Sequence, residues 1–111
     1  VRVVAHRFGR ELGEEVRSGV SGRASRARRL TALTETLDGY GYEPRREGSA
    51  IRLGNCPFHA LAESHRELVC GMNLALLEGV LEGMQGDELE ARPDPMPGRC
   101  CVTLAPRPEE A

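Results

Sequence analysis

The feature that most constrains the fold is the apolar pattern of residues 66–84. Apolar side chains recur there every three or four residues, as on one face of an α-helix: Cys70, Leu74, Leu77, Leu81 and Met84. Four more widen that face: Val69, Met72, Leu76 and Val80. So broad an apolar surface indicates deep burial or a contact with a second copy. Glu78 and Glu82 interrupt the run, which therefore does not have the pattern of a transmembrane segment.

Two further helices are predicted before it. The first has a stripe that ends near residues 18–22, made of Val1, Ala5, Phe8, Leu12 and Val16. A core-facing helix explains this stripe, and so does a helix that pairs with a second copy or continues from a preceding domain. The second helix is expected from about Ser25 to Gly39 or Gly41, with leucines on its inner face.

Short strands are expected in two hairpins. Residues 42–46 and 50–53 form the first, and Asn55 is predicted to cap a short helix over residues 57–64 that has a proline in its first turn. Residues 88–92 and 99–104 form the second hairpin, around a turn rich in proline.

The predicted order α-α-β-β-α-α-β-β gives an α+β fold, in which the two β-hairpins join one antiparallel sheet packed against helices. We expect a linker or dimerisation helix over residues 1–22, an α+β sensor domain over 23–105 and a disordered tail over 106–111. The chain of 111 residues is long enough for one compact domain and too short for two.

Charge and composition exclude several classes. The net charge of −2, from 15 basic and 17 acidic residues, argues against a standing attraction of the whole domain to nucleic acid or to an anionic membrane. The first residues lack the apolar region of a signal peptide. We therefore expect a cytoplasmic protein without a membrane segment. Four cysteines in such a chain indicate metal ligands, redox thiols or buried apolar residues rather than disulfides.

The cysteines are the main candidates for chemistry. Cys56 lies where a strand ends and a helix begins, so converging N–H groups should stabilise its thiolate. His59 follows one helical turn later, and Cys70 lies on the inward stripe of the long helix. Alternation along the last strand predicts that Cys100 points inward and Cys101 outward.

Three thiolates and one imidazole suit tetrahedral zinc, and a cysteine-rich set also suits an iron–sulfur cluster. The candidate ligands are Cys56, His59, Cys70 and Cys100, with Cys101 as a substitute. The alternative is that Cys70 and Cys100 are small core residues, because free cysteine is among the most buried residue types. No spacing typical of a zinc finger is present.

The segment "NCPFHALAESHRELVC", the long helix and the later "PGRCCVTL" resemble the C-terminal half of winged helix-turn-helix (ArsR-like) repressors that control iron–sulfur cluster assembly. In that pattern a Cys-Pro-aromatic sequence opens a short helix, a cysteine begins the long helix, and a cysteine follows a glycine turn on the last strand. The resemblance covers about residues 53–104. It implies a sensor and dimerisation domain, forming a homodimer, whose DNA-binding domain is not in this chain.

The chain departs from that pattern in one position. Cluster-binding members carry a further cysteine between the long helix and the last hairpin, and here residues 82–98 have none. Either His59 completes the set and the metal is zinc, or Cys101 substitutes, or the site has been lost.

Three other functions compete with this sensor. A thioredoxin-like thiol enzyme would use Cys56, but it requires a βαβ unit before the helix and a resolving thiol. A ligand-free dimerisation module would bury the cysteines, and a small-molecule sensor would use an apolar pocket under the sheet. No Ser–His–acid set or phosphate-binding glycine loop is recognisable, so we do not expect an enzyme.

Overall fold

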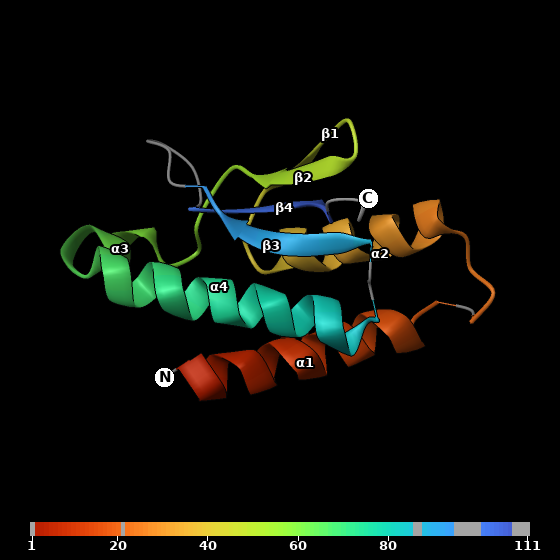
Figure 1. Cartoon of the computed structure of the whole chain (residues 1–111), viewed down its shortest axis with the longest axis horizontal. Helices are drawn as coiled ribbons and strands as arrows, with labels where there is room; N and C mark the ends of the chain where they lie inside the picture. The colour runs from red at the N-terminus through yellow and green to blue at the C-terminus, as the bar shows by residue number, and fades with distance from the viewer. Residues whose placement is uncertain (1, 21, 86–87, 95–100, 108–111) are drawn as a thin grey trace.

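The chain folds into four helices and one four-stranded sheet in the predicted order (Figure 1). The structure, a computed structural model, describes residues 2–20, 22–85, 88–94 and 101–107. The elements are α1 (Arg2–Ser18), α2 (Arg26–Gly39), β1 (Pro44–Glu47), β2 (Ala50–Leu53), α3 (His59–Ser64), α4 (Arg66–Gly83), β3 (Leu89–Pro93) and β4 (Val102–Pro106). The predicted α+β class and element order are confirmed.

The two hairpins join through their second strands, so the antiparallel sheet has the order β1-β2-β4-β3. In its register Ile51 lies opposite Leu104, and Leu104 lies opposite Ala91. Both Ile51 and Leu104 are buried in the single core. Alternation along each strand turns these side chains to one face, where the helices cover them.

The helix α4 lies between the sheet and α1 (Figure 1). Its apolar surface is therefore covered within the chain: Leu77 is 0% exposed, and Val80, on the side facing α1, is 1% exposed. Of the two explanations for this broad surface, deep burial is the one that the structure bears out. Among the described residues no helix has the length and apolar character needed to span a membrane.

The helices α1 and α4 run parallel and touch through their backbones. Gly9 and Gly13 of α1 face Gly79 and Gly83 of α4. Within each helix the two glycines are one helical turn apart. A Cβ atom added to Gly13 would lie 2.8 Å from the amide nitrogen of Met84, closer than real Cβ atoms approach. Small residues at these positions are therefore what allows the two helices to lie so close.

The predicted stripe of α1 is wrong at Phe8, and its first member, Val1, lies outside the described residues. Phe8 is 45% exposed, whereas Gly9 is buried against α4. The buried residues of α1 are Ala5, Gly9, Leu12, Gly13 and Val16. The contact surface is thus rotated toward the glycines, because these permit the closest approach.

Two predicted element ends also differ from the structure. Asn55 does not cap α3, which begins at His59. Its side-chain amide donates to the carbonyl of Gly41 at 2.8 Å and its N–H to that of Tyr42 at 3.0 Å, so it fastens the loop before β1. β4 continues to Pro106, one residue into the predicted tail. The proline turn and most of the tail lie outside the described residues.

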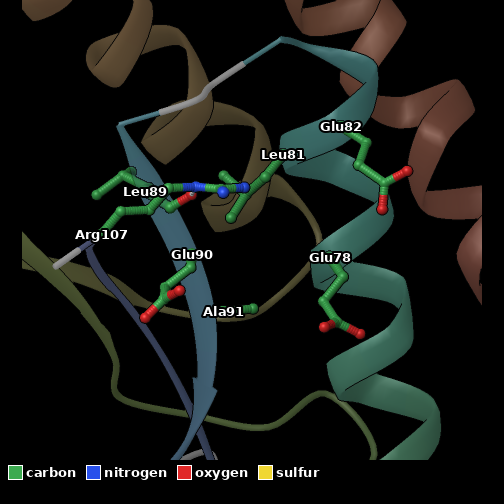
Figure 2. A pocket seen from close by; sticks show the side chains of 7 residues that line it. All are labelled: Glu78, Leu81, Glu82, Leu89, Glu90, Ala91 and Arg107. Carbon is green, nitrogen blue, oxygen red and sulfur yellow. Dashed lines mark hydrogen bonds between the residues drawn. The ribbon is translucent and has the colours of Figure 1, made fainter. Parts of the chain in front are cut away.

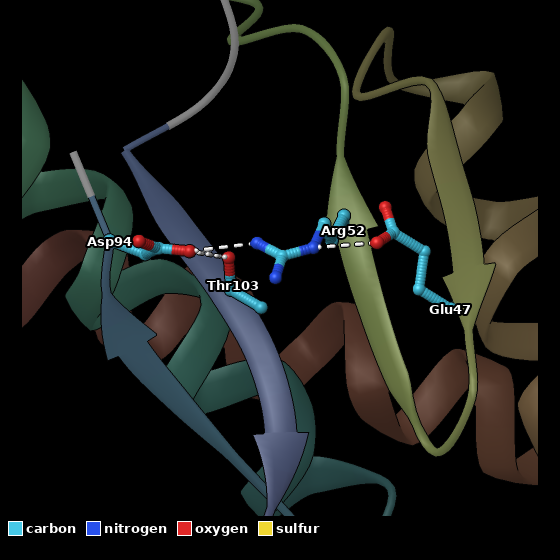
Figure 3. Close-up of polar contacts among 4 residues, drawn as sticks. All are labelled: Glu47, Arg52, Asp94 and Thr103. Atoms are coloured by element: carbon cyan, nitrogen blue, oxygen red, sulfur yellow. Dashed lines mark hydrogen bonds and ion pairs between the residues drawn. The ribbon is translucent and has the colours of Figure 1, made fainter. Parts of the chain in front are cut away.

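A polar network on the other face of the sheet holds the start of β4 (Figure 3). Arg52 donates to Glu47 at 2.9 Å and to Asp94 at 3.0 Å, and the Thr103 hydroxyl donates to the same Asp94 oxygen at 2.9 Å. The Asp94 N–H donates to the carbonyl of Cys101 at 2.6 Å. Asp94 thereby fixes the backbone of Cys101 just before the strand.

Candidate functional site

Three cysteines from distant parts of the sequence form the candidate site, here called the thiol cluster. Cys56 precedes α3, Cys70 lies in the second turn of α4, and Cys101 precedes β4. All three are free thiols, with Cys56 buried and the other two partly buried. Cys70 and Cys101 share a side-chain hydrogen bond, and Cys56 is near enough to interact electrostatically with Cys101.

The surroundings of Cys101 oppose its ionisation. Burial raises the pKa of the Cys101 thiol to about 12, and the hydrogen bond with Cys70 and the charges of Cys70 and Cys56 act in the same direction. Cys101 therefore stays protonated at neutral pH when no cation is present. A bound cation would offset both the burial cost and the repulsion between thiolates.

Local structure positions each of the three thiols in the cluster. A turn closed by the His59 N–H on the Cys56 carbonyl, at 3.0 Å, starts α3 after Cys56. Cys70 projects from the amino-terminal part of the long buried helix, and Asp94 holds the backbone of Cys101. Three segments that are far apart in the sequence are thus brought together by the tertiary fold.

The structure corrects the predicted orientation of Cys101. It was expected to point outward by alternation, but its thiol meets Cys70 and packs against the hydrophobic core. Cys101 precedes the first residue of β4, so the alternation that holds from Val102 onward does not extend to it.

The structure describes His59 but not Cys100. His59 is exposed in the first turn of α3, whereas Cys100 lies outside the described residues. Within the described ranges no group of three or more His, Cys, Asp or Glu side chains is placed to hold a metal ion together. The electrostatic proximity of the three thiols is thus a looser arrangement than a finished metal site. The ligand set Cys56, His59, Cys70 and Cys100 stays a prediction.

A buried polar pair beside the cluster was missed from the sequence. The Tyr42 hydroxyl donates to Oδ1 of Asn73 at 2.5 Å, and the two residues are 2% and 0% exposed. Asn73 lies less than one turn after Cys70 and joins α4 to the loop before β1. A single asparagine inside the apolar pattern of the long helix was the signal that could have revealed it, because buried amides require partners.

A second polar site in the described part of the chain is a cavity of about 210 Å³ between α4 and β3 (Figure 2). Glu78 and Glu82 of α4, Glu90 of β3 and Arg107 line it. Glu82 already pairs with His6 at 2.7 Å, outside the cavity lining. The residues that line it include no cysteine, histidine or serine, so they offer hard carboxylate oxygens and no soft metal ligand. The thiol cluster remains the better candidate.

Comparisons of the chain with protein-family models, with curated proteins and with solved structures found no match to any of them.

Proposed function

We propose that this chain is the sensor domain of a bacterial transcriptional regulator, and that the thiol cluster binds the signal as a soft metal ion or an iron–sulfur cluster. The observation that carries the proposal is the meeting of Cys56, Cys70 and Cys101 from three separate elements. Within the described residues these are the nucleophilic or soft-metal side chains that the fold gathers from segments far apart in sequence.

The donor atoms are of the kind that such a cofactor prefers. Thiolates are the preferred protein ligands of zinc and of iron–sulfur clusters. The raised pKa of Cys101 means that its thiolate is strongly disfavoured alone, and a metal supplies the positive charge that makes it favourable. Cys56, Cys70 and Cys101 would hold the metal, and His59 or Cys100 would supply a fourth ligand.

A redox switch is the second candidate, because Cys70 and Cys101 already share a hydrogen bond. Hydrogen peroxide would oxidise the two thiols to one disulfide and be reduced itself to two water molecules. The raised pKa of Cys101 disfavours this reaction, since the thiolate is the attacking species. A thioredoxin-like enzyme is less well supported, because a β-hairpin and not a βαβ unit precedes Cys56.

Ligation at the cluster would act on α4, which carries Cys70. The glycine contacts pack α4 closely against α1, so α1 is the element through which a change at the cluster would reach a DNA-binding domain elsewhere in the polypeptide. Dimerisation would use the outer side of α1, where Val3 and Val4 are 74% and 70% exposed. Sedimentation of the wild type and of Val4→Asp tests this: a dimer that Val4→Asp leaves intact would exclude that surface.

The metal content of anaerobically purified protein tests the proposal. We expect about one zinc ion, or the iron and sulfide of one cluster with its visible absorption, per chain. Cys70→Ser and Cys101→Ser should each lose it, while His65→Ala, which removes an exposed histidine outside the predicted set, should retain it. His59→Ala compared with His65→Ala then decides whether His59 is a ligand.

Two results would contradict the proposal. Wild-type protein without zinc or iron, even after reconstitution, would favour a ligand-free module. Its melting temperature would then be the same with and without a chelator, whereas loss of a structural metal lowers it. A disulfide between Cys70 and Cys101 after peroxide treatment, in protein that binds no metal, would favour the redox switch.

A further inference from the structure

The chain contains two phenylalanines, two tyrosines and no tryptophan, and all four rings line one cavity. Phe8 comes from α1, Tyr40 and Tyr42 from the segment after α2, and Phe58 from the turn before α3. The cavity measures about 250 Å³. Residues separated by up to fifty positions thus bring every aromatic side chain of the protein to the same place.

The rings occupy two levels of this cavity, here called the aromatic pocket. Phe8 and Tyr40 pack edge to face, with centroids 6.3 Å apart and planes at 81°. They are 45% and 48% exposed, so they lie at the mouth. Tyr42 is 2% exposed and lies inside. Leu12, Leu76 and Pro57 complete the lining.

The lining offers almost no polar group to a ligand. The Tyr42 hydroxyl is already engaged with Asn73, and none of the residues that line the pocket carries a charge. An anion or cation would lose its hydration there without gaining a counter-charge. A quaternary ammonium would gain from the ring faces, but no carboxylate in the lining offsets its desolvation. A neutral aromatic compound suits the pocket best, because its faces and edges can pack against the rings around it.

We infer that the aromatic pocket binds a small, neutral aromatic compound of one or two rings. The volume sets the size, since a cavity of about 150 Å³ accepts benzene and this pocket is larger by roughly the volume of a second fused ring. The pocket lining includes none of the cluster cysteines, and its ligand does not depend on any metal.

Indole is a suitable probe, because it is neutral, has two rings and fluoresces at excitation wavelengths where tyrosine does not absorb. The chain has no tryptophan, so all such emission comes from the probe. A blue shift of the emission and a calorimetric titration should report a Kd on the order of 0.1–1 mM, as expected for about nine non-hydrogen atoms. Indole-3-carboxylate should bind the purified chain at least about tenfold more weakly.

Substitutions at the mouth of the aromatic pocket test whether indole binds there. Phe8→Ala and Tyr40→Ala should each weaken indole binding by about tenfold, because each removes a stacking surface. Tyr40→Phe keeps the ring and should change the affinity by less than about twofold. Leu68→Ala, which alters an exposed apolar residue that does not line the pocket, serves as the matched control and should have no effect. Circular dichroism checks each variant, and if Phe8→Ala does not fold, Tyr40→Ala against Tyr40→Phe decides.

Three outcomes would overturn the inference. The first is the absence of any blue shift or heat up to the solubility limit of indole. The second is equal affinity for indole-3-carboxylate, or binding that survives both mouth substitutions. The third is a concentration-dependent association of the chain that Phe8→Ala abolishes while indole does not bind, which would make the mouth a contact between copies.

Discussion

Replacing Gly79 by alanine is the most direct test of the contact between α1 and α4. The added Cβ would lie 3.0 Å from the amide nitrogen of Arg10 and closer still to the carbonyl oxygen of His6. Carbon contacts are most favourable at about 3.5–4.0 Å, and these neighbours are backbone atoms that cannot move unless α1 moves. Overpacking of this kind costs about 1–3 kcal/mol, and the upper end applies because a whole helix must shift.

Alanine also favours the helix by about 1 kcal/mol over glycine, so the net loss of unfolding free energy should be about 2 kcal/mol. For 111 residues this lowers Tm by about 8 °C. Gly39→Ala is the matched control, because Gly39 is exposed in the last turn of α2 and an added Cβ would meet nothing within 4 Å. It should leave Tm unchanged or raise it by about 2–4 °C.

The two substitutions are chemically identical, so their opposite signs in a thermal unfolding experiment isolate the packing. A Tm for Gly79→Ala equal to or above that of the wild type would refute the close approach of the two helices. Gly9→Ala provides a second test from the other side, since its Cβ would strike the carbonyl of Leu76.

Four further predictions concern the thiol cluster, the core and the polar network on the other face of the sheet. Alkylation of Cys101 by iodoacetamide, followed by mass spectrometry of the metal-free protein, should be much slower than for a free cysteine at pH 8, because its pKa is raised to about 12. The same shift makes folding stability pH-dependent. The contribution of Cys101 to the unfolding free energy is fully present below the unfolded pKa of about 8.5 and is lost as the pH rises toward 12. Denaturant unfolding at several alkaline pH values would detect this loss. Tyr42→Phe should lower the unfolding free energy by about 1–2 kcal/mol in denaturant titration, since it removes a buried hydrogen bond to Asn73. Arg52→Ala should cost at most about 1 kcal/mol, because its ion pairs with Glu47 and Asp94 are partly exposed.

The element order was predictable from the sequence because hydrophobic periodicity marks each helix and strand locally. The pairing of glycines across α1 and α4 was not predicted, since a glycine in a helical pattern is usually taken as a weak point or an end. Gly9 with Gly13 and Gly79 with Gly83 have the spacing of one helical turn, so the signal was present in both segments. It becomes a contact only when the tertiary fold places the two helices side by side.

The thiol cluster was partly predictable for the same reason. Cys56 and Cys70 were assigned to their elements from local patterns, but the meeting with Cys101 depends on where β4 starts. Alternation describes residues inside a strand, so it gave the wrong direction for a residue just before one. The sequence likewise leaves two roles open for the Asn55 side chain, which could cap a helix or bond to the loop before β1. In the structure it donates to the carbonyl of Gly41.

The segment 56–58 connects the two proposed sites. Cys56 belongs to the thiol cluster, while Pro57 and Phe58 line the aromatic pocket, and each site also uses a residue of α4. A ligand in the pocket and a metal at the cluster would therefore act on the same turn. If binding of the metal shifts that turn and thereby changes the affinity of the protein for the pocket ligand, thermodynamic linkage requires the pocket ligand to change the affinity for the metal by the same factor. Equal indole affinities in metal-loaded and metal-free protein would show that the two sites are independent.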